Sequence, residues 1–329
     1  MHGDASTGPE IGLLLYPGCQ MAMVHGITDM FEVASFYARA QGRAPLRTSH
    51  WRMGDDGTFT RAHDGAPGMS GDPDVLIVPG RLGPLADADE AAPYARWLLD
   101  RHARGTVLAS NCGGAFILAA TGLLAGREAT THWFFAQEMQ DRFPDIRVEP
   151  GRIVIDDGDL ITAGGLMAWT DLGLRLVDRL LGPSIMLETA KFMLINPGGR
   201  EQRNYSVFSP QLTHGDEAIL KVQHWLQSRA GRLVSVLDMA RQAGLEERTF
   251  LRRFKSATGM KPIEYVQHLR VGKAREMLEF TRRPVDQIAW SVGYEDPAAF
   301  RRIFARIVGL SPGDYRTRFA SRTELDAVA

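Results

Sequence analysis

The feature that most constrains this chain is a pair of similar helical patterns in its last quarter, between residues 234 and 319. Each pattern combines a short amphipathic helix, a glycine that can adopt positive φ at the turn, and a second helix with phenylalanine on one face and arginine on the other. The turn glycines are Gly244 and Gly293. If only one helix-turn-helix pattern were present, a helical bundle that binds another protein would be an equally good interpretation. Two such patterns in tandem predict a domain that reads duplex DNA.

The second helix of each pattern supplies the expected DNA contacts. Four phenylalanines should hold these helices down: Phe250, Phe254, Phe300 and Phe304. The opposite faces carry the arginines Arg248, Arg252, Arg301 and Arg302, which are free to face a groove of DNA. Arginine can hold guanine through two hydrogen bonds, although a phosphate contact or a solvated charge without DNA contact stays open for any one of these arginines. Because a long helix, predicted from 262 to 279, separates the two readers, we expect them to enter adjacent major grooves about 10–10.5 bp apart.

Length and charge indicate two domains of different character. A chain of 329 residues is too long for one ordinary core, and its 44% apolar and 23% charged residues are typical of a soluble globular protein. Residues 1–213 hold 18 basic and 25 acidic residues, whereas residues 214–329 hold 20 and 14. A basic C-terminal part fits contact with nucleic acid.

Several classes of protein are excluded by what the sequence lacks. No apolar run approaches a membrane span and no signal pattern is present, so we expect a cytoplasmic protein. Two cysteines, Cys19 and Cys112, cannot build a disulfide framework or a four-cysteine zinc site. We expect neither a metal nor a cofactor.

The first half of the chain alternates buried-strand and helix patterns. The expected strands are 11–16, 74–80, 106–110, 152–155 and 160–162, and the expected helices are 29–39, 93–104, 115–124 and 165–181. This alternation predicts an α/β domain with a parallel sheet covered by helices on both faces. We therefore expect an α/β domain at 1–195, a linker at 196–213, and an all-α tandem helix-turn-helix domain at 214–329.

Cys112 lies at the point where the third expected strand runs into a helix, in the segment Ser110–Ala115. This arrangement resembles a nucleophile elbow, in which a side chain projects at the carboxyl edge of a sheet. The partial positive charge of a helix start would favour a thiolate there. A small cysteine that merely fills a tight turn is an equally open alternative.

Longer motifs point to known families. In the C-terminal part they are Leu237–Ala240, Phe250–Lys255, Pro262–Tyr265, Val292–Tyr294, Phe300–Phe304 and Gly309–Pro312. These residues resemble the AraC/XylS family of transcription regulators, with Tyr294 where phenylalanine is commoner. The resemblance implies that Arg248, Thr249 and Arg252 read base edges in one major groove, and that the second groove is lined by Asp296, Ala298, Ala299, Arg301 and Arg302. In the N-terminal part the motifs are Tyr16–Gly18, Val78–Gly80, the Cys112 elbow and Ala129–Trp133. They resemble the class I glutamine-amidotransferase-like superfamily, which includes PfpI, and most of all its branch of isocyanide hydratases and GlxA-type regulators. This resemblance implies a flavodoxin-like sandwich.

The resemblance also implies what the N-terminal domain has lost. Met23 stands where isocyanide hydratases carry aspartate, and Gly113 stands where the relatives carry threonine or histidine. Both changes remove proton-transfer groups, so we expect no catalysis, with His25 and His132 as the remaining candidate partners of Cys112. The predicted ligand-binding residues are Cys112, Gly113, Gly114, His132, Met23 and His25.

The resemblance then implies a regulator, more often an activator, that binds double-stranded DNA and a small, nitrogen-containing effector. A homodimer formed through the N-terminal domain is expected, and RNA polymerase is a further candidate partner. Two alternatives stay open: an isocyanide hydratase-like or amide-acting cysteine enzyme fused to a DNA-binding domain, and an architectural DNA binder with an inert N-terminal domain.

Overall fold

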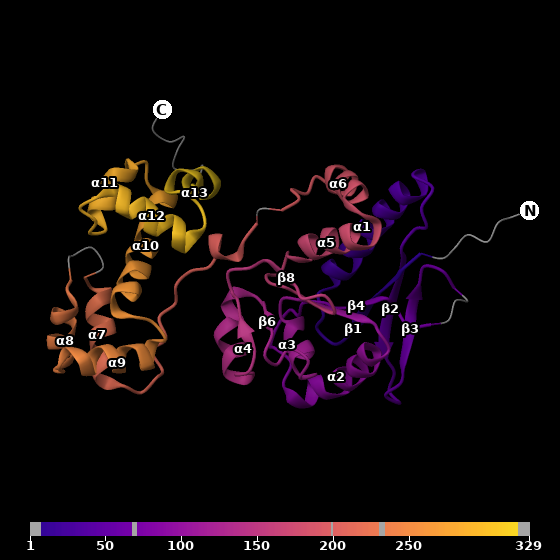
Figure 1. The fold of residues 1–329 in the computed structure, drawn as a ribbon, viewed down its shortest axis with the longest axis horizontal. Coiled ribbons are helices and arrows are strands. Elements are labelled where there is room, and N and C mark those ends of the chain that lie inside the picture. The colour runs from indigo at the N-terminus through magenta and orange to yellow at the C-terminus, as the bar shows by residue number, and fades with distance from the viewer. Residues whose placement is uncertain (1–7, 68–70, 199, 230–233, 322–329) are drawn as a thin grey trace, which may run out of the picture. The chain divides into compact units, whose positions relative to one another are not determined.

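The computed structural model describes residues 8–67, 71–198, 200–229 and 234–321. By its internal contacts the chain divides into two units, residues 1–202 and 203–329 (Figure 1). The boundary falls inside the segment predicted as a linker. Among the described residues, no helix is both long and apolar enough to cross a membrane.

The N-terminal unit is built on a seven-stranded sheet with the strand order β3-β2-β1-β4-β5-β9-β8. Its strands are β1 Glu10–Leu15, β2 Arg47–Met53, β3 Phe59–Asp64, β4 Val75–Val78, β5 Val107–Asn111, β8 Val154–Asp156 and β9 Leu160–Ala163. The five central strands are parallel, and the edge strands β3 and β8 run antiparallel to their neighbours. A separate ribbon pairs β6 Glu128–Ala129 with β7 Arg147–Val148.

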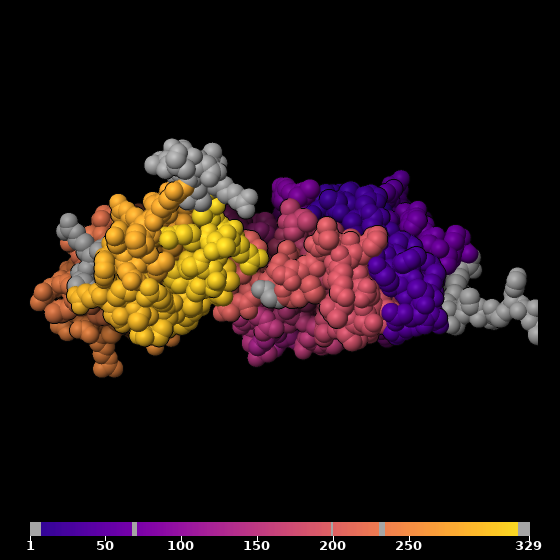
Figure 2. All heavy atoms as spheres, turned by 90° about the horizontal axis from the view of Figure 1, so that it is seen from above, coloured from indigo at the N-terminus to yellow at the C-terminus, as the bar shows by residue number. Residues whose placement is uncertain are grey.

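Helices cover both faces of this sheet, as Figure 1 shows. One core contains residues of α1 Met21–Ala40, α5 Trp169–Leu181 and α6 Pro183–Phe192. The other contains residues of α2 Ala88–Ala103, α3 Gly114–Ala119 and α4 Ala136–Arg142, which follows the short helix η1 Trp133–Phe135. On the first face, α1, α5 and α6 form a continuous part of the surface (Figure 2). The predicted α/β sandwich is confirmed, although the sheet is mixed at its edges.

Some predicted boundaries are wrong for local reasons. Helix α2 begins five residues before Pro93, because Asp87 and Glu90 form a capping box at its start. Helix α1 begins at Met21 rather than at residue 29, and α3 ends at Ala119 rather than at residue 124. The predicted acidic turn is confirmed: Gly158, with φ +91°, lies between the antiparallel strands β8 and β9.

The C-terminal unit is helical. After η2 Gln202–Asn204, which crosses the boundary, its helices are α7 Glu217–Gln227, α8 Val236–Ala243, α9 Glu247–Thr258, α10 Pro262–Phe280, α11 Val285–Ser291, α12 Pro297–Val308 and α13 Pro312–Phe319. One core joins α7, α8 and α9 to the first half of α10, and a second core joins the rest of α10 to α11, α12 and α13. The long helix α10 therefore carries both helix-turn-helix motifs.

Both motifs have the expected interiors. Phe250, Phe254, Phe300 and Phe304 are fully buried. The turn glycines adopt positive φ, +68° at Gly244 and +87° at Gly293. Ala240 on α8 and Ala289 on α11 are buried as well.

Candidate functional site

The exposed faces of α9 and α12 carry the predicted DNA contacts. Arg248 and Arg252 on α9 and Arg302 on α12 are exposed, and Thr249 is half-buried beside them. Ala298 is exposed at the start of α12, next to the half-buried Ala299. The sequence therefore placed these residues correctly on the surface. Their contact with DNA stays a prediction.

Arg301 is the exception among the arginines. The sequence predicts a free side chain, but its guanidinium forms an ion pair with Asp286 on α11. Asp286 lies in the first turn of α11, where the helix dipole favours an acidic residue. Arg301 must therefore leave, or share, this carboxylate if it is to contact DNA.

Asp296 also has a role that the sequence did not reveal. Its side chain is the N-cap of α12 and accepts hydrogen bonds from the amides of Ala298 at 2.8 Å and Ala299 at 3.0 Å. Each carboxylate oxygen is used by one amide, so Asp296 stabilises the start of α12. This structural role does not require contact with DNA.

Helix α9 is linked to the N-cap of α7 by Arg253, to which the sequence patterns assigned no structural role. Arg253 donates two hydrogen bonds to Asp216, from Nε at 2.9 Å and from Nη2 at 2.8 Å. Asp216 in turn caps α7 by accepting from the amide of Ile219 at 3.2 Å. The hydrogen bond from Arg253 lowers the pKa of Asp216 and keeps the pair charged. Arg253 therefore serves structure, unlike its neighbour Arg252.

The Cys112 elbow is formed as expected in the N-terminal unit. Cys112 is one of two described non-glycine residues with positive φ, +50°, and it is 2% exposed. Its amide donates to the carbonyl of Ala163 on β9 at 2.7 Å, and its carbonyl accepts from the hydroxyl of Thr131 at 2.8 Å. A side chain at Gly114 would overlap with the carbonyls of Pro79 and Val78, so the turn needs glycine there.

Of the two alternatives left open for Cys112, the structure favours a buried thiol over a thiolate. Burial raises the pKa of the Cys112 thiol to about 11, and a hydrogen bond from the Gly113 amide opposes this only weakly. The sequence pattern suggested a helix start beside the sulfur, but α3 is only six residues long. Desolvation outweighs the helix start, and the thiol is protonated at neutral pH.

The other predicted ligand residues separate into two groups. Gly113 and Gly114 follow Cys112 directly, and half-buried His132 adjoins Thr131, whose hydroxyl bonds to Cys112. His132 uses Nδ1 to accept from the amide of Phe134 at 3.1 Å. Met23 and His25 are carried by the first turns of α1: Met23 is fully buried in the apolar core beneath that helix, and exposed His25 faces the ring of His50, with centroids 6.5 Å apart.

Polar groups that the sequence did not single out lie close to the elbow. Gly80 faces all of them: a methyl group added there would lie 3.2 Å from Gln20 Oε1, from Asn111 Nδ2 and from the Cβ of Cys112. Within the described part of the chain, Gln20 Oε1 and Asn111 Oδ1 are buried and accept no hydrogen bond. Unpaired buried acceptors cost about 1–3 kcal/mol each. They therefore mark a place where a donor group would be stabilised.

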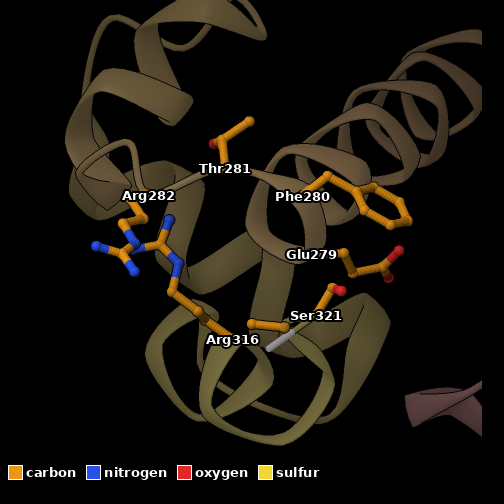
Figure 3. A pocket seen from close by; sticks show the side chains of 7 residues that line it. Glu279, Phe280, Thr281, Arg282, Arg316 and Ser321 are labelled. Atoms are coloured by element: carbon orange, nitrogen blue, oxygen red, sulfur yellow. The ribbon is translucent and has the colours of Figure 1, made fainter. Parts of the chain in front are cut away.

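A cavity of about 260 Å³ lies in the C-terminal unit, where α10 ends beside α13 (Figure 3). It is lined by Glu279, Phe280, Thr281, Arg282, Arg316, Ala320 and Ser321. The carboxylate of Glu279 accepts a hydrogen bond from Tyr315, and Arg316 donates to the carbonyl of Arg283. No motif in the sequence predicted this cavity.

Comparison with known proteins matches both units. Residues 239–318 match the profile of a helix-turn-helix domain, and residues 68–179 match that of the DJ-1/PfpI family. These two matches identify the helical unit as an AraC-type helix-turn-helix domain and the α/β unit as a DJ-1/PfpI-type domain. The chain therefore contains both kinds of domain in the predicted order.

Three relatives illustrate the similarity. The transcriptional regulator GlxA of Rhizobium meliloti is 29% identical over 211 residues, which are 63% of this chain and 64% of GlxA. The transcriptional regulator CdhR of Pseudomonas aeruginosa is 27% identical over 327 residues, 96% of this chain and 91% of CdhR. An isonitrile hydratase of Pseudomonas putida is 36% identical over 112 residues, 33% of this chain and 46% of that enzyme.

Proposed function

We propose that this chain, which joins a DJ-1/PfpI-type domain to an AraC-type helix-turn-helix domain, is a DNA-binding transcription regulator controlled by a small molecule. The observation that carries the proposal is the tandem motif: two helices with buried phenylalanines and exposed arginines, both attached to α10. The similarity to GlxA and CdhR, both named as transcriptional regulators, supports it.

DNA is recognised, in this proposal, by the exposed faces of α9 and α12. Arg248, Arg252 and Arg302 supply the positive charge, and the C-terminal residues 214–329 carry six more basic than acidic residues. Such a surface attracts phosphates over long range, whereas bidentate contacts to guanine provide sequence discrimination. Binding should therefore be both sequence-specific and sensitive to salt.

The effector binds beside Cys112. The oxygens of Gln20 and Asn111 are acceptors without a donor in the described structure, so they favour a ligand that offers N–H groups, such as an ammonium, a guanidinium or an amide. This chemistry supports the nitrogen-containing effector expected from the family resemblance. We retain the predicted residues Cys112, Gly113, Gly114 and His132 as the surroundings of the ligand, with Met23 and His25, three and five residues after Gln20 on α1, as further candidates.

An enzymatic role for the N-terminal unit is the second candidate, favoured by the similarity to an isonitrile hydratase. Three observations support the regulator instead. The pKa of Cys112 is raised to about 11, Met23 lies in the apolar core, and Gly113 has no side chain to transfer a proton. Turnover of an isonitrile that is abolished by Cys112→Ala would establish the enzyme.

The proposed function is tested by DNA capture. The purified full-length chain is mixed with fragments of its own genome, with and without a cell extract that supplies the effector, and the retained fragments are sequenced. We expect enrichment of a common sequence, and a changed yield when the extract is present. Retention of random fragments only would contradict a sequence-specific regulator.

The effector site is tested on the captured fragment with a panel of amines, amides and amino acids. We expect Gln20→Ala and Asn111→Ala to abolish the response to the active compound while DNA binding without it is unchanged. The proposed homodimer is tested independently: light scattering of the full-length chain gives its molar mass, and we expect that of a dimer.

A further inference from the structure

We infer that the segment Arg200–Ser206, here called the strap, couples the site beside Cys112 to the second recognition helix, α12. The inference rests on the proposed function, because it concerns how the effector site controls DNA binding. The sequence predicted a linker over residues 196–213, a region rich in glycine and proline at its start. In the structure, two residues of the strap are as buried as core residues: Gln202 and Asn204 are each 2% exposed.

Gln202 is the first anchor. Its side-chain nitrogen donates to the carbonyl of Thr131 at 2.8 Å, to the carbonyl of Arg152 at 2.9 Å and to the hydroxyl of Thr130 at 3.0 Å. Its side-chain oxygen accepts from the amide of Trp133 at 3.0 Å. All of these partners belong to the N-terminal unit. The carboxamide therefore has both its donor and its acceptor satisfied inside that unit.

The first anchor touches the two backbone segments that hold Cys112. Thr131, which accepts from Gln202, donates its hydroxyl to the carbonyl of Cys112. On the other side, a side chain at Gly164 would overlap with the Gln202 carboxamide, and Gly164 follows Ala163, the partner of the Cys112 amide. The carboxamide of Gln202 therefore lies between these two segments. A ligand that displaces the Cys112 elbow also displaces the groups that bind Gln202.

Asn204 is the second anchor. Its side-chain nitrogen donates to the carbonyl of Val308, the last residue of α12, at 2.7 Å. The last carbonyls of a helix have no partner within the helix, so Asn204 supplies one that α12 itself cannot. The following turn at Gly309 packs tightly on the strap, because a side chain at Gly309 would lie 2.8 Å from the Asn204 nitrogen.

Arg275 on α10, in the same C-terminal unit as Asn204, binds the backbone of the strap. Its guanidinium donates to the carbonyl of Asn204 at 3.0 Å, to the carbonyl of Ser206, and from Nε to the hydroxyl of Tyr315 at 2.8 Å. Tyr315 donates onward to Glu279, which lines the cavity in Figure 3. Strap, α10, α12 and α13 are thus joined by one hydrogen-bonded network.

Only Arg203 separates the two anchors. Neighbouring Cα atoms are about 3.8 Å apart, so a single residue has little slack with which to absorb a displacement of Gln202. A long flexible linker would let the two sites act independently. In the strap, a displacement of one anchor residue instead displaces the other. Coupling between binding sites is reciprocal, so DNA bound to α12 must also affect the surroundings of Cys112.

This reciprocity allows a test that does not require the effector. In a full-length Cys19→Ser background, Cys112 is the only thiol, and its rate of modification by N-ethylmaleimide is followed by mass spectrometry at fixed pH. The rate is measured with and without the captured DNA fragment. We expect DNA to change it by at least about fivefold, the lower end of ordinary coupling between sites.

Two variants each remove the side chain of one anchor of the strap. We expect Gln202→Ala and Asn204→Ala each to reduce the effect of DNA on Cys112 to less than about twofold, while both still bind the fragment. Gln41→Ala, which changes an exposed glutamine after α1, is the matched control and should retain the full effect. If Gln202→Ala does not fold, as judged by circular dichroism, Asn204→Ala alone decides the question.

The outcomes distinguish this inference from the function on which it rests. DNA binding with no change in Cys112 modification overturns the strap and leaves the regulator intact. The strap is also overturned if DNA has its full effect on Cys112 in a folded variant of either anchor. Failure of the parent chain to bind any fragment overturns the proposed function, and the coupling with it.

Discussion

Asp286 on α11 and Arg301 on α12 form an ion pair that joins the two helices of the second helix-turn-helix motif. Both side chains are about half exposed, at 47% and 48%, so the pair remains open to competition from solvent and from DNA. A phosphate or a guanine that takes Arg301 must first displace Asp286. The ion pair therefore weakens any DNA contact that depends on this arginine.

Replacing Asp286 with asparagine should strengthen DNA binding. The change frees Arg301, and we expect affinity to rise by about two- to fivefold, the equivalent of an exposed ion pair. The slope of log affinity against log salt should become steeper by about one, because one more cation is available for phosphate. Fluorescence anisotropy on a captured fragment over a salt series measures both. An equal gain in an Arg301→Ala background would show that Arg301 is not the cause.

Two neighbouring arginines on α9 should have different roles: Arg252 in DNA binding and Arg253 in stability. Arg252→Ala is expected to weaken DNA binding, by about 5- to 150-fold if the side chain contacts a base, with little change in melting temperature. Arg253→Ala should lower the melting temperature, because it leaves the Asp216 cap of α7 without its partner. Anisotropy and thermal unfolding of both variants separate the two roles. Equal losses of affinity at unchanged stability would contradict the assignment.

His50 should make the N-terminal unit sensitive to acid. It is 8% exposed and hydrogen-bonded to Thr28 at 3.0 Å, and burial, followed by the charges of His63 and His25, lowers its pKa to about 4. The unfolded chain takes up this proton near about pH 6.5, before the folded chain does. Stability is therefore present above about pH 6.5 and is lost as the pH falls toward 4, by about 1–2 kcal/mol.

Urea unfolding at several pH values measures this loss. We expect His50→Gln to reduce the difference in the free energy of unfolding between about pH 6.5 and pH 4. His224→Gln, on the exposed face of α7, is the control and should leave the difference unchanged. A pH profile of His50→Gln identical to that of the parent would show that this histidine does not cause the acid sensitivity.

Cys112 should behave as a buried thiol rather than as a nucleophile. Because its pKa is raised to about 11, the rate of alkylation in the Cys19→Ser variant should keep rising with pH until about that value. Stopped-flow or mass-spectrometric rates between neutral and alkaline pH provide the profile. A plateau reached near neutral pH would indicate a stabilised thiolate and would favour the enzymatic alternative.

The parts of the fold that local patterns determine could be predicted from the sequence. The buried phenylalanines of α9 and α12, the turns at Gly244 and Gly293, and the hairpin at Gly158 all follow from spacing and from backbone freedom. Strands β2 and β3 were missed, because Arg47–Met53 and Phe59–Asp64 are largely polar and lack the apolar runs of the other strands. Their place at one side of the sheet becomes clear only when the partner strands are known.

The residues missed at the sites have partners far away in the chain. The Arg301–Asp286 pair spans two helices, and the side chain of Asn204 bonds to a residue 104 positions later. Nothing near Gln202 in the sequence marks it as buried, since it follows a glycine-rich stretch without periodicity. The raised pKa of Cys112 has the same origin, because burial by tertiary packing outweighed the local helix start that the sequence displayed.

The central claim is that α9 and α12 occupy successive major grooves of one duplex. Hydroxyl-radical footprinting of the full-length chain on a captured fragment tests it most directly. We predict two protected regions on one face of the DNA, about 10–10.5 bp apart, with Arg252→Ala weakening one and Arg302→Ala weakening the other. A single protected region, or two that respond identically to both substitutions, would contradict the account.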